Sequence, residues 1–149
     1  MESNEIRETL RAADRAEAAP WLDYPPTPAW YPLAVGLWAA GITLVLGYLM
    51  DGWRIAGIVS LIAVEIVFLS WYARYRGTLP SGAAPRGLRP AIARFCAAFV
   101  GVVALVLAGA LLVAPWTGAA VAVAGVTGLV RWYERAYAVA AQRTRAHLA

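Results

Sequence analysis

Four long apolar segments dominate the pattern of hydrophobic and polar positions along this chain, and short polar or turn-forming stretches separate them. The segments are residues 31–50, 53–73, 90–114 and 117–138. A helix needs about 20 mostly apolar residues to cross the hydrocarbon core of a bilayer, and the first three segments reach that length with few charges. The pattern predicts an all-α integral membrane protein, a four-transmembrane-helix bundle made of two helical hairpins within residues 31–138.

The fourth segment has a shorter uncharged part than the other three. Residues 117–130 lack charge, and as a helix they extend about 21 Å, less than the roughly 30 Å of the hydrocarbon core. Neither glycine nor proline follows Arg131 before the end of the chain. We therefore expect one long helix that carries Arg131 inside the membrane and continues through residues 139–149 as a cytoplasmic helical extension.

Two segments of different character precede the first span. Residues 1–20 are rich in charge, and arginines recur at a spacing of four, which predicts a short polar helix on the cytoplasmic side. This helix is either solvated or docked on a partner or the membrane surface. Residues 21–32 combine prolines with tryptophan and tyrosine, which predicts an extended, Pro-rich strap lying along the membrane interface.

The placement of arginine predicts the orientation in the membrane. The segment between the second and third spans and the segment after Val130 are both rich in arginine, whereas the two opposite turns contain only Arg54. By the positive-inside rule, we expect a multi-pass protein of the plasma membrane with cytoplasmic N- and C-termini. The lipid bilayer is thus the first expected partner, and the arginines can also bind anionic lipid headgroups. Because topology explains the arginines, we expect no nucleic acid partner.

Composition argues against most kinds of catalytic or metal site. The chain is 61% hydrophobic and 15% charged, whereas a soluble domain is about 25% charged. One cysteine, Cys96, and one histidine, His147, supply neither an internal disulfide nor a Cys/His zinc site. The sequence also lacks a glycine-rich phosphate loop and a Ser/His/Asp set. We therefore expect no catalytic residue, no metal and no cofactor.

Glu65 is the main functional candidate, because it interrupts the second apolar segment near its centre. An ionisable side chain at the bilayer centre costs about 2.5–3.5 kcal/mol on insertion scales. Helical rise places Glu65 about 18 Å and Arg131 about 21 Å below the outer interface, while Arg94 enters from the cytoplasmic side. Glu65 either pairs with Arg131 or Arg94, or is protonated and structural, or carries protons or cations along a transport or signalling path.

Small residues recur at helical spacing in three of the spans and predict faces where helices pack closely. The predicted packing positions are Ala120, Ala124 and Gly128 in the fourth span, Ala97 and Gly101 in the third, and Gly36 in the first. Such faces serve packing within one bundle or between copies. Arg131 and Thr127 share a helix face with Ala124 and Gly128 by their spacing, so we expect that face to be covered by protein.

The two hairpins also share a weak sequence repeat. The second span ends in Trp71-Tyr72-Ala73-Arg74 and the fourth reaches Trp132-Tyr133-Glu134-Arg135, each after a turn that contains a tryptophan. Two helical hairpins of the same orientation can arise by duplication. An aromatic belt at the interface explains the same residues without duplication.

Two functional hypotheses follow from these features. The first is a non-enzymatic interaction or accessory subunit that forms a homo-oligomer or joins a membrane protein partner, with Glu65 paired and sealed from water. The second is a small proton- or cation-coupled transporter or channel, with Glu65 facing an aqueous path. A membrane enzyme is a third interpretation and would need a pocket that holds Glu65 together with tyrosines.

Overall fold

The computed structural model describes residues 2–22, 27–77, 84–85 and 87–148, and these residues form helices and connecting turns without any strand. The helices are α1 (Glu2–Leu22), α2 (Tyr31–Tyr48), α3 (Asp51–Arg76), α4 (Arg89–Leu112) and α5 (Pro115–Leu148). Three helical stretches, Tyr31–Tyr48, Asp51–Tyr75 and Arg89–Leu112, are long and apolar enough to cross a membrane. The predicted all-α class is therefore confirmed, and the described residues contain three such helices.

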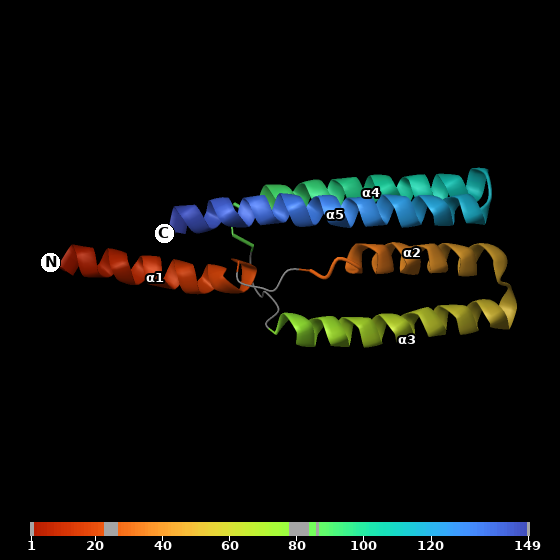
Figure 1. Ribbon diagram of the computed structural model, residues 1–149, viewed down its shortest axis with the longest axis horizontal. Helices are drawn as coiled ribbons and strands as arrows, with labels where there is room; N and C mark the ends of the chain where they lie inside the picture. The colour runs from red at the N-terminus through yellow and green to blue at the C-terminus, as the bar shows by residue number, and fades with distance from the viewer. Residues whose placement is uncertain (1, 23–26, 78–83, 86, 149) are drawn as a thin grey trace.

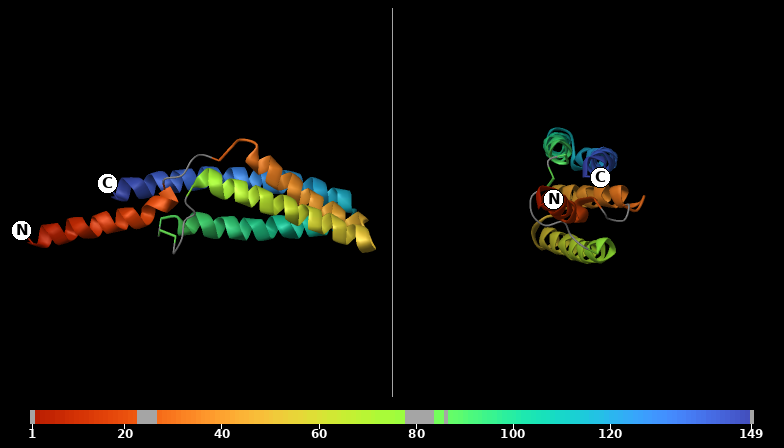
Figure 2. Two further views of the ribbon diagram at one scale, coloured as in Figure 1. Left: turned by 90° about the horizontal axis from the view of Figure 1, so that it is seen from below. Right: turned by 90° about the vertical axis from the view of Figure 1, so that its left-hand side faces the viewer.

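The helices α2 to α5 run up and down beside one another, with both hairpin turns at one end of the molecule and both chain termini towards the other (Figure 1). α5 packs along both α2 and α4, whereas α3 contacts α2 alone. Viewed from the end, α3 lies on the opposite side of α2 from α4 and α5 (Figure 2). The arrangement is thus an open one with α3 at its edge, and it differs from a closed bundle in which every helix contacts two neighbours.

Close packing of α2 on α5 forms the centre of the molecule. A Cβ atom added to Gly36 would lie 2.9 Å from the carbonyl oxygen of Val123 and would also collide with Thr127. The Thr127 hydroxyl donates a hydrogen bond of 3.3 Å to the carbonyl oxygen of Pro32. Further along the same contact, small buried side chains meet, namely Ala40, Ala119 and Ala122. Gly36 therefore lies at a close helix contact, where the sequence placed it.

The helix boundaries differ from the predicted ones at several points. α1 passes through Pro20 and ends at Leu22, because a proline in the last turn removes one hydrogen bond without preventing the turn. Of the predicted strap, residues 21–22 therefore belong to α1 and residues 31–32 to α2, while residues 23–26 lie outside the described part. α3 continues to Arg76 and ends at Gly77, whose φ of 76° favours glycine. Residues 78–83 and 86 of the predicted loop also lie outside the described part.

The C-terminal half of α5 continues its apolar first half as one helix, and α1 packs against it. Buried side chains from α1, the start of α4 and α5 form a cluster of Ala18, Leu22, Leu88, Tyr137 and Ala141. The Tyr137 hydroxyl donates a 2.7 Å hydrogen bond to the carbonyl oxygen of Trp21, and Arg145 donates one to the carbonyl oxygen of Leu22. α1 therefore covers one face of the helical extension after residue 138.

Candidate functional site around Glu65

Glu65 belongs to the half-buried stripe of α3 that faces α2. The stripe recurs every three or four residues and consists of Gly57, Leu61, Glu65, Phe68 and Tyr72. Trp38 of α2 donates its indole N–H to the carbonyl oxygen of Leu61 at 3.3 Å. Tyr31 of α2 stacks on Phe68 and Tyr72, with ring centroids 5.5 and 5.1 Å apart. Since residues before and after Glu65 in this stripe contact α2, Glu65 lies on the side of α3 that faces α2.

No counter-charge for Glu65 comes from the helix it faces. α2 contains no acidic residue, arginine, lysine or histidine. The two candidate partners are exposed arginines on other helices, Arg94 on α4 and Arg131 on α5, and α3 contacts neither of these helices. Among the described residues, both arginines therefore lie on helices that do not contact the helix of Glu65, and the pairing within one chain stays a prediction.

Glu65 and Arg131 nevertheless lie at similar positions along their helices. The two hairpin turns are at the same end of the molecule (Figure 1), so distances from these turns can be compared. Glu65 lies about 21 Å along α3 from Asp51, and Arg131 lies about 24 Å along α5 from Pro115. Glu65 and Arg131 therefore lie at similar distances from the hairpin-turn end of the molecule, although they are on separated helices.

The small residues of α5 that the sequence predicts as packing positions lie on its exposed side. We call Ala120, Ala124, Gly128 and Arg131 the outer face of α5, because all four are exposed and follow each other at helical spacing. A Cβ atom added to Gly128 would meet nothing within 4 Å. Thr127, which was assigned to this face, points instead to α2. The outer face is thus not a packing surface within the chain.

The two predicted packing positions of α4 are exposed as well. Ala97 and Gly101 are exposed, and a Cβ atom added to Gly101 would meet nothing within 4 Å. The glycines that do pack α4 on α5 are Gly109, Gly118 and Gly125, and none of them is a predicted packing position. Spacing of small residues therefore identified smooth faces, but among the six predicted positions only Gly36 lies in a close contact between helices of one chain.

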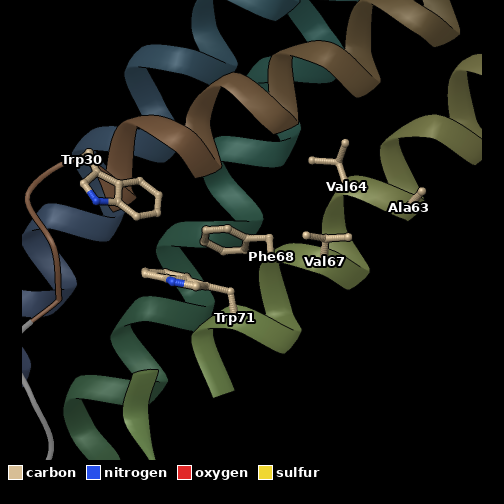
Figure 3. Close-up of a pocket in the computed structure, with 6 residues that line it drawn as sticks. All are labelled: Trp30, Ala63, Val64, Val67, Phe68 and Trp71. Atoms are coloured by element: carbon tan, nitrogen blue, oxygen red, sulfur yellow. The ribbon is translucent and has the colours of Figure 1, made fainter. Parts of the chain in front are cut away.

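An apolar groove on α3 was not predicted. It has a volume of about 710 Å³ and is lined by Trp30, Ala63, Val64, Val67, Phe68 and Trp71. Trp30 projects from the start of α2 towards Phe68 and Trp71 (Figure 3), with ring centroids 6.1 and 5.2 Å away. The spacing of Phe68 and Trp71, which places both rings on one side of α3, was the sequence feature that could have indicated this groove. Because Glu65 does not line the groove, this space supplies no polar path to the carboxylate.

In the described part of the chain, no group of three His, Cys, Asp or Glu side chains is placed to hold a metal ion. Glu134 has a carboxylate oxygen that is buried without a hydrogen-bond partner, but it lies on α5, a helix that α3 does not contact. Apart from Asp51 at a helix start, Glu65 is the only acidic residue in the three helices that are apolar enough to span a membrane.

Comparison of this chain with known protein families, with curated proteins and with solved structures finds no match. Three features of the described part of the chain bear on its function. These are the half-buried Glu65 on α3, the outer face of α5, and the position of α3 at the edge of the helix arrangement.

Proposed function

We propose that the protein is a non-enzymatic membrane subunit that acts by assembling with other membrane proteins, first of all with copies of itself. One observation carries the proposal: Arg131 is exposed on α5, in line with the small residues Ala120, Ala124 and Gly128. Small residues at such spacing allow membrane helices to approach closely, and a charged residue within a span usually faces protein or water rather than lipid. A protein partner on the outer face of α5 satisfies both requirements.

In this proposal α5 is the fourth membrane span. Its first half is uncharged, and it packs closely on two helices that are long and apolar enough to span a membrane, α2 and α4. The protein would then lie in the plasma membrane, with its hairpin turns at the outer surface and both termini in the cytoplasm. The positions of the arginines favour this orientation. α1 and the C-terminal half of α5, which pack together, would form a cytoplasmic extension.

Association in vesicles tests the proposal. Copies labelled with a donor or an acceptor fluorophore at the C-terminus are reconstituted together, and energy transfer is followed as lipid is added. We expect transfer above the level of random proximity. Replacing Gly128 with leucine should lower the transfer, because the larger side chain obstructs the outer face of α5 without meeting any neighbour in its own chain.

Gly101→Leu is the matched control, since Gly101 is a glycine on the exposed side of α4 with equally free space. It should leave the transfer at the wild-type level. If the wild-type protein shows only the transfer expected for randomly distributed monomers, self-association is rejected.

A second candidate function is a small proton- or cation-coupled transporter or channel, and one observation favours it. In the described part of the chain, the one helix that contacts α3 supplies no positive charge to Glu65, and an unpaired carboxylate at membrane depth binds a proton or cation more readily than a paired one. Proton flux into vesicles tests this function. Wild-type protein should accelerate the decay of an imposed pH gradient and Glu65→Gln should not. Equal decay with both proteins, or with empty vesicles, rejects the transport role.

A further inference from the structure

We propose that Glu65 on α3 of one copy forms an ion pair with Arg131 on α5 of a second copy. The two charges have opposite sign and similar depth, and they remain apart within one chain. This inference rests on the proposed function, because it names the contact through which copies assemble.

The direction of the helices permits this pair between copies that are inserted in the same way. α3 and α5 both run from the hairpin-turn end of the molecule towards the end that carries the termini (Figure 1). α3 of one copy and α5 of its neighbour are therefore parallel. Glu65 is about 21 Å and Arg131 about 24 Å from the start of its helix, and the long, flexible side chain of Arg131 can bridge the remaining offset of about 3 Å.

Glu65 needs a partner more than Arg131 does. The carboxylate is about 9 Å from the nearer edge of a hydrocarbon core of roughly 30 Å that begins at Asp51. Glutamate has a short side chain and does not extend to the headgroups as arginine does. Neither α2 nor the uncharged neighbours of Glu65 on α3 supply a positive charge. A neighbouring copy supplies one at the required depth.

Arg131 matches Glu65 better than Arg94 does. Arg94 lies about 27 Å from the outer end of α4 at Leu112, which is about 6 Å nearer to the cytoplasmic side than Glu65. In addition, Arg131 follows three small residues on the outer face of α5, so a helix can approach closely at its side. Ile62 and Leu69 flank Glu65 on α3 and are 47% and 54% exposed, which leaves that side of α3 open to a neighbour.

The symmetry of the assembly determines how often the pair occurs. In a two-fold dimer the contact is reciprocal, so the Glu65–Arg131 pair forms twice. In a ring, α3 of each copy meets α5 of the next, and the pair forms once in each interface. In both cases every Glu65 carboxylate is neutralised without a partner of another kind.

Association of charge variants in vesicles tests the pair, with energy transfer between labelled copies as the measurement. Glu65→Gln and Arg131→Gln should each weaken association about three- to twenty-fold, the range expected for one polar contact between membrane helices. The double variant should associate no more weakly than either single variant, because both changes remove the same contact. Exchange of the two charges, Glu65→Arg with Arg131→Glu, should restore association. Arg94→Gln is the control and should associate like the wild type.

The outcomes separate this inference from the proposed function. Wild-type protein that stays monomeric rejects self-association, and the pair with it. Wild-type protein that assembles while Glu65→Gln or Arg131→Gln associates normally overturns the pair alone, and Arg131 then extends to lipid headgroups instead. Failure of the exchanged charges to restore association, in a variant whose helix content and Tm match the wild type, also overturns the pair.

Discussion

The two hairpins of this protein, α2–α3 and α4–α5, have similar sequence patterns but pack differently. Between α4 and α5, Gly109 and Gly118 meet small residues: a Cβ atom on Gly109 would lie 3.3 Å from the amide nitrogen of Gly118, while Gly125 faces Val102. Between α2 and α3 each glycine meets a larger side chain, Gly57 facing Val45 and Gly41 facing Leu61. Opposed small residues bring α4 and α5 into extended contact, whereas α3 contacts α2 more sparsely.

Similarity between the hairpins is retained at the end near the termini. Tyr72 stacks on Tyr31 with ring centroids 5.1 Å apart, and Tyr133 in the second hairpin packs on Phe95 at 4.4 Å. In both hairpins the tyrosine of the Trp-Tyr pair therefore contacts an aromatic ring on the preceding helix. The hairpins differ in the middle, where α3 carries Glu65. This comparison suggests a rigid pair, α4–α5, and a helix α3 that is available for a contact with another copy.

The largest effect is expected from overpacking the tight hairpin. In Gly118→Val, the Cβ atom alone would lie 2.8 Å from the carbonyl oxygen of Val106 and 2.6 Å from the Ala110 Cβ atom, so α4 and α5 must separate. We expect a loss of about 1–3 kcal/mol in the free energy of unfolding, measured by thermal unfolding in detergent. Gly128→Val is the control on the same helix and should keep the wild-type Tm. Equal Tm values for the two variants would contradict the description of the α4–α5 contact.

A smaller effect is expected in the loose hairpin, because aromatic contacts hold α3 there. Tyr72→Ala removes stacking with Tyr31 and Phe68, at about 0.5–1.5 kcal/mol for an aromatic pair. Hydrogen exchange should accelerate in α3 and stay unchanged in α4. Tyr48→Ala, at a tyrosine that is 57% exposed, serves as control. Acceleration spread evenly over all helices would show that α3 does not open independently.

The contact of α1 with the second hairpin should depend on one hydrogen bond. Tyr137→Phe removes the donor to the carbonyl oxygen of Trp21 and should weaken the docking of α1 by about 0.5–1.5 kcal/mol. The expected result is faster hydrogen exchange in the last two turns of α1, with Tyr48→Phe as the control. If α1 exchanges at the wild-type rate, the apolar cluster and the Arg145 hydrogen bond maintain the contact between α1 and α5 without Tyr137.

The smallest effect is expected where a glycine meets a flexible side chain. In Gly41→Ala the new Cβ atom would lie 3.3 Å from a methyl group of Leu61, which can rotate away, so stability should change by no more than about 0.5 kcal/mol. Gly36→Ala is the matched comparison on α2, because its Cβ atom meets the backbone of α5. A lower Tm for Gly41→Ala than for Gly36→Ala would reverse the assignment of loose and tight contacts on α2.

Hydropathy predicted where the helices lie, because each span needs a minimum apolar length. The predicted C-terminal ends of α1 and α3 were wrong, since Pro20 is tolerated in a last turn and α3 continues to Arg76. The distances of Glu65 and Arg131 from their hairpin turns were predictable, as helical rise is constant. The sequence could not predict which helices are neighbours, because an apolar helix is compatible with protein or lipid on any side. The small residues of α5 could therefore indicate a smooth face without indicating what covers it.

Cysteine crosslinking in vesicles tests the central claim, that α3 of one copy meets α5 of another, most directly. One population carries Ile62→Cys and the other Gly128→Cys, each three residues before the charged residue on its helix, in a Cys96→Ser background that removes the only native cysteine. With different tags on the two populations, a mixed product identifies a link between copies. We predict that oxidation forms this product, and that Gly101→Cys in place of Gly128→Cys does not. Equal yields for both positions, or no mixed product in protein that self-associates, would contradict the claim.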